Sequence, residues 1–445
     1  MPKDCHKYSQ IDFSLIKSIP NAISDQADAV RLYGASFSNT FSSVAVGPSH
    51  VITIADGVIA IWDKCSGKQI INGTTQTLFG VFTTTFSVVF LYYDEFSHRF
   101  FVVTPNNTNY QIAISKSSKP KDLVNDWYRY TYNTGVTHLN THVGLNCKYL
   151  YVTSTTDAFL NNVLIFNKHS LLNGGPLEVA NNLNLNTTTT LINFIPLLVR
   201  PPTECHESSS SHKAYFVEFT SSTSLTLYVL IGNTTVKSYV IPITSWNAPP
   251  VTVPQPGGLP NLNTNDFLMT FGILINDSIY VLQNISSLDG RAILRWYEIK
   301  VTCKTPKLKQ QGNIDPGIGK NAFAGHLAVD DHENVAFSFA ISGATQIPAL
   351  AYTGRLHCDP KGTTRTPVQI AFVGTVGYAN LFPIPQVWGT TGIAVDPCHD
   401  AFWIYGQYGV PTQTGQILAD WSTFLGSFKL KKSCRTQNNS PGGQV

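Results

Sequence analysis

One repeated hairpin limits the possible folds of this chain more than any other feature. "LAVDDHENVAFSFAIS" (327–342) and "IAVDPCHDAFWIYG" (393–406) each have an apolar strand ending in Ala-Val-Asp, a short polar turn and a second apolar strand. Similar segments occur at 44–55, 88–103, 142–154 and 268–283, and a weaker copy with a longer turn lies at 197–219. The turns fall near residues 48, 96, 147, 206, 276, 332 and 398, which makes seven copies.

Each copy belongs to a unit of about four short strands. After the first hairpin comes "VIAIWDKCSGKQI" (58–70), in which Asp63 and Ser66-Gly67 predict a tight turn. A four-stranded sheet cannot cover both of its faces alone, whereas a radial arrangement buries each face against the next sheet. We therefore expect an all-β, seven-bladed β-propeller, with six or eight blades as the alternatives. The hairpins are its inner strands, and Asp330 and Asp396 should accept backbone N–H groups in their turns.

The repeat sets the expected domain limits. A β-propeller is predicted over 40–430, with an N-terminal extension at 1–39 and a C-terminal tail at 431–445. The last unit supplies only three strands, so we expect a strand near 32–38 to complete it and to remove an exposed edge. The Pro/Gly-rich stretch 247–266 is interpreted as a long loop between blades.

Composition excludes some classes of partner. Only 13 % of the residues are charged and the net charge is +3, so the chain has no broad basic field for nucleic acid. The longest apolar run, near 191–199, is about half of the ~18 residues that a membrane span needs. The first residues lack the apolar core of a signal peptide. We infer that the chain either stays inside the cell or is the mature form of a secreted protein.

Eight cysteines favour the secreted alternative. None forms CxxC, and no Cys/His cluster has zinc spacing. Widely spaced cysteines in even number are more typical of disulfides, which form in oxidising compartments, than of metal ligands. We predict bridges between sequence neighbours: Cys5–Cys65, Cys147–Cys205, Cys303–Cys358 and Cys398–Cys434. The last is the firmest prediction, because it closes the shortest loop and the final strand leads back beside its turn.

Seven sequons also point to secretion, although a chain this rich in Asn, Ser and Thr forms several by chance. They predict N-linked glycans on the outer surface. The acceptor residues are Asn72, Asn106, Asn186, Asn233, Asn276, Asn284 and Asn438.

Four stretches resemble a family of secreted β-propeller proteins, common among uncharacterised bacterial extracellular proteins. "VAVGPSHVITIADGVIAIWDKCSGK" (44–68) is similar to its "AVGP-H-V---N---AIYDK-G" segment, and "YYDEFSHRFFVV" (92–103) to its "YD-FS-RWFV" segment. "LAVDDHENVAFSFAISGATQIPALAYTGR" (327–355) and "WGTTGIAVDPCHDAFWIYGQY" (388–408) resemble its later segments. The resemblance implies the propeller and an extracellular location, and it brings no catalytic residues. The family's cysteine before the last Phe-Trp-Tyr strand is displaced here to Cys398.

Few segments suggest chemistry. The chain contains no HExxH, no GxSxG and no EF-hand loop. "GIGKNA" (317–322) imitates the start of a dinucleotide fingerprint, but it follows Ile-Asp-Pro rather than a strand, so we interpret it as a glycine-rich loop. "SSLDGRAILRW" (286–296) is close to an Asp-box turn with its glycine one place early, and we interpret it as a hairpin turn. We expect no cofactor.

His332 and His399 occupy matching places in two of the repeated turns, beside Asp331 and Asp400. As ligands they would form a site, but we favour polar turn residues, because we expect equivalent turns of different blades to lie far apart in a ring.

A third turn contains Asp94, Glu95 and His98. Carboxylates at a channel mouth could bind calcium. Nothing spaces these residues as one calcium loop, so we expect no metal here and again favour polar turn residues.

The sequence therefore favours an extracellular, non-catalytic protein that associates with itself, as a subunit of a fibre or surface assembly. Catalytic motifs are lacking, the expected fold is a rigid platform, and its strand edges can pair with an incoming arm. The alternative is a secreted lectin or glycan-active enzyme that uses the channel mouth. That alternative requires carboxylates or exposed aromatic rings to converge there, although strand aromatics lie more often in the core.

Overall fold

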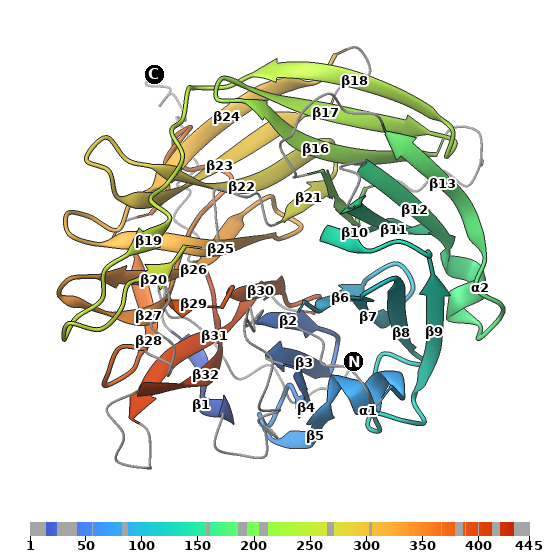
Figure 1. The fold of residues 1–445 in the computed structure, drawn as a ribbon, viewed down its shortest axis with the longest axis horizontal. Helices are drawn as coiled ribbons and strands as arrows, with labels where there is room; N and C mark the ends of the chain where they lie inside the picture. The colour runs from blue at the N-terminus through green and yellow to red at the C-terminus, as the bar shows by residue number, and fades with distance from the viewer. Residues whose placement is uncertain are drawn as a thin grey trace, which may run out of the picture.

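The computed structural model describes most of the chain between Leu15 and Leu430, and it places most of the described strands in seven sheets around a central axis (Figure 1). The protein is a seven-bladed β-propeller, as the seven hairpins predicted. The described residues are 15–24, 42–55, 57–81, 88–156, 161–185, 194–203, 212–264, 271–301, 305–365, 367–378, 386–387, 389–398, 400–411 and 419–430.

Blades 1 to 4 follow one another along the chain, each with its first strand nearest the axis. Blade 1 comprises β2 (Ser43–Val46), β3 (His50–Ala55), β4 (Val58–Asp63) and β5 (Gln69–Thr74). Blade 2 comprises β6 (Phe90–Asp94), β7 (Arg99–Asn106), β8 (Asn109–Ser115) and β9 (Trp127–Asn133). Blade 3 comprises β10 (His138–Leu145), β11 (Tyr149–Thr156), β12 (Asn161–Asn167) and β13 (Val179–Leu185). Blade 4 comprises β14 (Ile195–Pro196), β16 (Lys213–Ser221), β17 (Ser224–Ile231) and β18 (Thr235–Pro242).

Blades 5 to 7 complete the ring. Blade 5 comprises β21 (Gly272–Ile275), β22 (Ser278–Ser286), β23 (Ala292–Lys300) and β24 (Lys307–Ile314), with β15 (Leu198–Arg200) added on its inner side. Blade 6 comprises β25 (Asn321–Val329), β26 (Val335–Gly343), β27 (Gln346–Arg355) and β28 (Gln369–Val373). Blade 7 comprises β30 (Gly392–Val395), β31 (Phe402–Pro411), β32 (Ala419–Phe428) and β1 (Leu15–Ser24).

Both faces of each blade are buried, which explains the apolar runs in the sequence. In β3, Ile52 and Ile54 pack against blade 2, whereas Val51 and Ala55 pack against blade 7. Successive residues of a strand point to opposite faces, so a strand between two neighbours must be apolar at nearly every position. Each of the seven contacts between adjacent blades has its own cluster of buried apolar side chains.

The hairpin turns define the two faces of the ring. We call the face on which the first and second strands of each blade connect the inner-turn face, and the opposite face, where one blade leads to the next, the crossover face. On the inner-turn face, Asp330 accepts the backbone N–H groups of His332 at 2.9 Å and Asn334 at 2.8 Å. Asp396 accepts that of Cys398 at 2.9 Å. The predicted turn role of both aspartates is confirmed.

The weakest predicted copy is organised differently from the others. We expected 197–219 to form one hairpin of blade 4, but β15 leaves that blade and pairs in parallel with β21, with Leu198 opposite Ile273 and Arg200 opposite Ile275. The inner strand of blade 4 is instead the two-residue β14, which pairs with β16. The departure of β15 carries Arg200 to its carboxylate partners on the axis.

Minor elements lie at the rim and on the crossover face. The short helices are α1 (Thr75–Phe79) and α2 (Lys168–Leu172). The stretch 247–266 connects blades 4 and 5, as expected. It contains β19 (Thr252–Val253) and β20 (Leu262–Asn263), which form a small sheet with β29 (Gln386–Val387).

Blade 7 is completed by the N-terminal strand β1, which pairs antiparallel with β32. We expected this strand near 32–38, and that stretch lies outside the described residues. The strand that performs the closure, Leu15–Ser24, contains a proline at position 20 and too few apolar residues in alternation to stand out in the sequence.

Candidate functional site: the central channel

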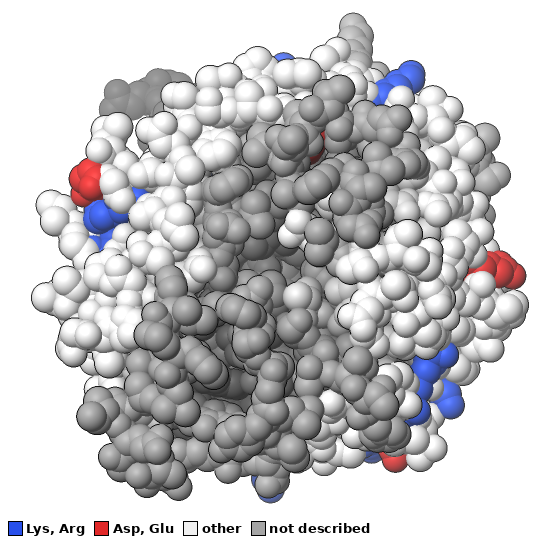
Figure 2. Space-filling model, viewed as in Figure 1, with Lys and Arg blue, Asp and Glu red and all other residues white. Residues whose placement is uncertain are grey.

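The innermost strands enclose a cavity of about 520 Å³ along the axis of the ring. Most of its described lining comes from β2, β6, β10, β15, β21, β25 and β30 and from residues next to these strands, and Pro105 of β7 and Asn284 of β22 also contribute. On the face that Figure 2 shows, the described charged side chains lie mainly towards the rim of the ring. From the inner-turn face to the crossover face, the lining changes from charged groups to aromatic rings and imidazoles, and then to hydroxyl and amide groups.

Arg200 neutralises the charged end of the channel. Its Nε lies 2.6 Å from Oε1 of Glu95 in blade 2, and one Nη lies 3.3 Å from Oδ1 of Asp331 in blade 6. The other Nη donates to the carbonyl oxygen of Val329. The guanidinium therefore joins opposite sides of the ring, and it compensates the carboxylate of Glu95 that we considered for calcium.

Two further ion pairs on the inner-turn face are almost completely buried. Lys168 Nζ lies 2.6 Å from Asp94 Oδ2, with side-chain exposures of 1 % and 2 %. Lys64 Nζ lies 2.8 Å from Asp396 Oδ1, with exposures of 4 % and 3 %. Each pair joins neighbouring blades, 3 to 2 and 1 to 7. Burial lowers the pKa of the Lys168 ammonium, and Asp94 opposes that change.

The histidine turns are correctly predicted as polar, but the reason we gave was wrong. His332 and Asp400 lie in the turns of adjacent blades, and His332 Nδ1 is 3.9 Å from Asp400 Oδ1. Equivalent turns of neighbouring blades therefore do meet. Both side chains are exposed, and His399 lies outside the described residues. Within the described ranges, no three His, Cys, Asp or Glu side chains gather as metal ligands would.

The middle of the channel contains aromatic rings and neutral imidazoles. Phe271 stacks on Tyr92 with ring centroids 5.7 Å apart and meets His326 edge-on at 5.9 Å. Phe90 lies against His142, with centroids 6.4 Å apart. Burial lowers the pKa of His142 and of His326 to about 4, so both rings are neutral at pH 7. No sequence pattern singles out either histidine.

The crossover end of the lining offers uncharged polar groups. Ser42 is 1 % exposed and Thr390 is 4 % exposed, and neither hydroxyl has a hydrogen-bond partner among the described residues. Asn284 Nδ2 lies 3.4 Å from the carbonyl oxygen of Thr264. Buried polar groups in folded proteins are nearly always paired, so the two hydroxyls mark positions where a bound molecule gains contacts.

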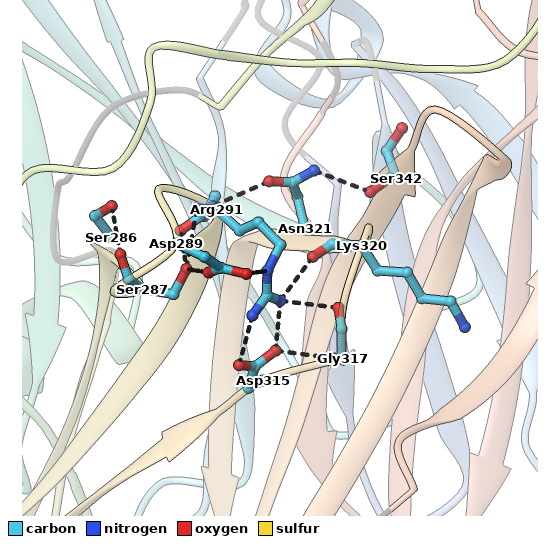
Figure 3. A network of polar contacts seen from close by, with 10 residues as sticks. Ser286, Ser287, Asp289, Arg291, Asp315, Gly317, Lys320, Asn321 and Ser342 are labelled. Atoms are coloured by element: carbon cyan, nitrogen blue, oxygen red, sulfur yellow. Dashed lines mark hydrogen bonds and ion pairs between the residues drawn. The ribbon is translucent and has the colours of Figure 1, made fainter.

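The glycine-containing segments 286–296 and 317–322 meet on the crossover face, where polar contacts connect them (Figure 3). Arg291, in the turn between β22 and β23, bonds to Asp315 at 2.6 and 2.9 Å. It also donates to the carbonyl oxygens of Gly317 at 2.8 Å and Lys320 at 3.1 Å. Both segments are connections between strands, which confirms the interpretation of 317–322 as a loop and of 286–296 as a hairpin turn.

The cysteines agree in part with the predicted disulfides. Cys65, Cys147 and Cys358 are disulfide-bonded, and their partners lie outside the described residues, so the individual pairings remain predictions. Cys398 is a free thiol, so the bridge that we predicted to Cys434 is not formed. The backbone N–H of Cys398 is held by Asp396, and its Sγ lies 3.9 Å from the carbonyl oxygen of Pro48 in blade 1.

The acceptor asparagines of the sequons differ in their exposure to solvent. Asn72 and Asn276 are exposed, whereas Asn284 is only 4 % exposed. A glycan on Asn284 would have to occupy the protein interior, so this sequon is unavailable in the folded chain. Asn186 and Asn438 lie outside the described residues, and glycans at the remaining sites stay predictions.

Comparisons with known proteins give only distant likenesses. No family model and no curated protein matches the chain. The WD40 domain of SCAP from fission yeast is 9 % identical over 92 % of this chain and 98 % of its own, with a TM-score of 0.40. Drosophila Semaphorin 1b, extracellular domains 1–2, is 7 % identical over 93 % and 87 %, with a TM-score of 0.41. A protein of unknown function from Dyadobacter fermentans is 9 % identical over 94 % and 99 %, also at 0.41.

These likenesses are too distant to say what the chain does. Its class, a seven-bladed β-propeller, is defined by its own sheets. No helix in the described part of the chain is long and apolar enough to cross a membrane.

Proposed function

We propose that this protein is a non-catalytic, extracellular interaction propeller that associates with a second copy of itself through the outer edge of blade 6. The observation that carries the proposal is strand β28. Its sequence, QIAFV, has no charged residue, and Ile370 and Val373 are 41 % and 43 % exposed. Its outer edge pairs with no other strand among the described residues.

An uncharged, apolar strand edge is a ready site for pairing with another chain. Other outer strands carry a protecting charge, such as Arg129 in β9, Lys237 in β18 and Lys309 in β24. Strands β5 and β13 are also uncharged, but β5 contains the exposed sequon at Asn72, and the exposed residues described in β13 are Ala180 and Asn182 rather than large apolar side chains. Two copies of β28 can pair antiparallel about a two-fold axis, which gives a closed and self-complementary contact.

The absence of catalysis in this proposal rests on the charged end of the channel. A glycan-active enzyme at this mouth needs carboxylates that are free to act as acid and base. The carboxylates that we considered there are engaged by cations: Asp94 by Lys168, and Glu95 by Arg200. Pairing of this kind fixes the blades to one another, which supports a structural role for these groups.

The extracellular part of the proposal rests on the disulfides. Cys65, Cys147 and Cys358 are disulfide-bonded, and such bonds persist mainly in oxidising compartments. The exposed sequons at Asn72 and Asn276 are consistent with the same location.

Sedimentation velocity of the full-length protein tests the proposal. The wild type should show a monomer–dimer equilibrium that shifts to dimer with concentration. The double variant Ile370→Lys, Val373→Lys places two charges on the β28 edge, and its dimer should weaken at least about tenfold, a loss of about 1.4 kcal/mol.

Leu288→Lys with Ile318→Lys is the matched control. These side chains are more exposed, at 108 % and 93 %, but they lie in loops rather than on a strand edge, so the control should dimerise like the wild type. A wild type that stays monomeric at every concentration contradicts the proposal. If the dimer of the control weakens equally, general surface hydrophobicity rather than the β28 edge drives the association.

A further inference from the structure

The channel cavity is separate from the β28 edge and has the features of a small-ligand site. Its volume of about 520 Å³ falls within the range of roughly 300–1,000 Å³ that is typical of ligand pockets in proteins. Such pockets combine apolar walls with a few polar groups that orient the ligand. The described lining groups therefore indicate the chemical class of the ligand.

The charge of the lining favours an uncharged ligand. Among the described lining residues, Glu95 and Arg200 are the only ones with a fixed charge, and their side chains bond to each other at 2.6 Å. His142 and His326 face the cavity as neutral rings. A charged ligand would lose its hydration and find no free counter-charge, which is strongly unfavourable.

The unpaired polar groups favour a ligand with hydroxyls. His326 Nδ1 bonds to the carbonyl oxygen of Thr391, which can only accept, so Nδ1 carries the proton and Nε2 is an acceptor. No described residue donates to Nε2. The buried hydroxyls of Ser42 and Thr390 can each donate and accept. A purely apolar ligand would leave all of these groups unsatisfied, at a cost of about 1–3 kcal/mol each.

The aromatic wall favours a ligand that also has an apolar face. Phe271 and Tyr92 are stacked, and His326 lies edge-on to Phe271, so these rings form a continuous surface in the middle of the channel. The Tyr92 hydroxyl donates to the carbonyl oxygen of Val143 at 3.1 Å, which fixes the ring. Rings of this kind bury C–H surface well and leave the rim of a bound molecule free to hydrogen-bond.

We propose that the channel binds a neutral mono- or disaccharide. The C–H face of the sugar packs on Phe271 and Tyr92, one sugar hydroxyl donates to His326 Nε2, and others bond to Ser42 and Thr390 towards the crossover face. A saccharide combines, in one uncharged molecule of this size, apolar ring faces with several hydroxyls.

Isothermal titration calorimetry of the full-length protein at pH 7.5 tests the site. The probes are a panel of neutral hexoses, pentoses and their disaccharides, with glucuronate as a charged sugar and cyclohexanol as an apolar ring. At least one neutral saccharide should bind, and glucuronate and cyclohexanol should bind at least about tenfold more weakly.

Two variants locate the binding in the channel. His326→Phe keeps a ring against Phe271 but removes the acceptor, and Thr390→Val keeps the shape but removes the hydroxyl. Each should weaken binding by about tenfold, the effect of about 1.4 kcal/mol. His332→Phe, in the exposed turn that follows β25, is the matched control and should bind like the wild type. If His326→Phe fails to fold, as judged by circular dichroism, the affinity of Thr390→Val tests whether the ligand binds in the channel.

Three results would overturn the proposal. They are no binding by any neutral saccharide, unchanged affinity in the variants, or preferential binding of glucuronate or cyclohexanol. None of them affects self-association at β28, because the cavity and that edge share no residue.

Discussion

Ion pairs on the two faces of the propeller have the same chemistry and very different surroundings. On the inner-turn face, Lys168 and Asp94 are 1 % and 2 % exposed. On the crossover face, Arg291 is 15 % exposed and its partner Asp315 is 41 % exposed. The first pair lies between two blades at the end of their shared core, whereas the second holds two surface loops together (Figure 3).

This difference indicates which ion pairs hold the blades of the ring together. A buried pair adds little stability over an apolar pair of the same shape, but the loss of one partner leaves an uncompensated charge inside the protein. An exposed pair is screened by water and salt, and its loss is nearly neutral. The inner-turn face therefore contains single residues whose loss should separate blades, and the crossover face should tolerate change.

The largest expected effect is at Lys168. Lys168→Met leaves Asp94 buried without its cation and should lower the free energy of unfolding by about 3–5 kcal/mol. Chemical denaturation with a second substitution measures the coupling. Adding Asp94→Asn removes the stranded charge, so the double variant should recover most of the loss. A loss below about 1 kcal/mol in Lys168→Met would erase the contrast between the faces.

A somewhat smaller effect per residue is expected from pH, and it extends the comparison to the channel. The pKa of His142 and of His326 is about 4 in the folded chain and about 6.5 when unfolded. Below pH 6.5 the unfolded chain therefore binds protons that the folded chain does not. Stability should fall as the pH decreases from about 6.5 to 4, and below pH 4 these two groups add no further slope.

One pKa unit corresponds to about 1.4 kcal/mol, so each ring accounts for up to roughly 3 kcal/mol. Urea denaturation at several pH values measures this. His142→Phe should remove about half of the slope that the two rings produce. His332→Phe, at an exposed position, should keep the wild-type slope, and a loss of slope there would mean that the channel histidines are not responsible.

The smallest effect is expected at Arg291. Arg291→Lys keeps the charge but cannot reproduce the bidentate contact with Asp315 or the bonds to Gly317 and Lys320. Surface ion pairs of this kind contribute about 0–1 kcal/mol, and 1 M salt should reduce the difference further. Thermal unfolding at low and high salt checks this. A loss as large as that at Lys168 would show that the crossover loops also hold the ring together.

Local sequence predicted most of the blades because their signals are local. The hairpins around Asp330 and Asp396 combine an apolar strand with a turn residue a few positions away, and the same pattern gave the turns near residues 48, 96, 147 and 276. Ring closure by β1 could not be placed in this way. Its partner β32 is almost the whole chain away, and the pairing depends on ring geometry rather than on neighbouring residues.

The charged contacts of the site depend on residues that are distant in sequence, and most were missed. Lys64 and Asp396 are 332 positions apart. One signal was available: Lys64 follows Asp63, and Lys168 follows Asn167, each directly after the third strand of its blade. Two lysines at matching positions of a repeat, where the chain is otherwise poor in charge, indicate a shared role across blades.

The channel residues had no such signal. His142 and His326 lie within inner strands, and in the sequence they look like any polar residue in an apolar run. His332, which we had selected for its matching place in a turn, is exposed instead. Which residue of an inner strand faces the axis depends on how the seven blades twist around it, and this is a property of the assembled ring.

Ring closure by β1 and β32 also affects how the chain is made. The first of these strands, which ends at Ser24, leaves the ribosome before the other blade strands, and its partner, which begins at Ala419, leaves after all of them. At about 5–20 residues per second, the interval is on the order of tens of seconds. Throughout it, the side of blade 1 that will face blade 7 has no partner. The nascent protein is therefore an open arc with an uncovered apolar surface, and it becomes a closed ring only after β32 has been made.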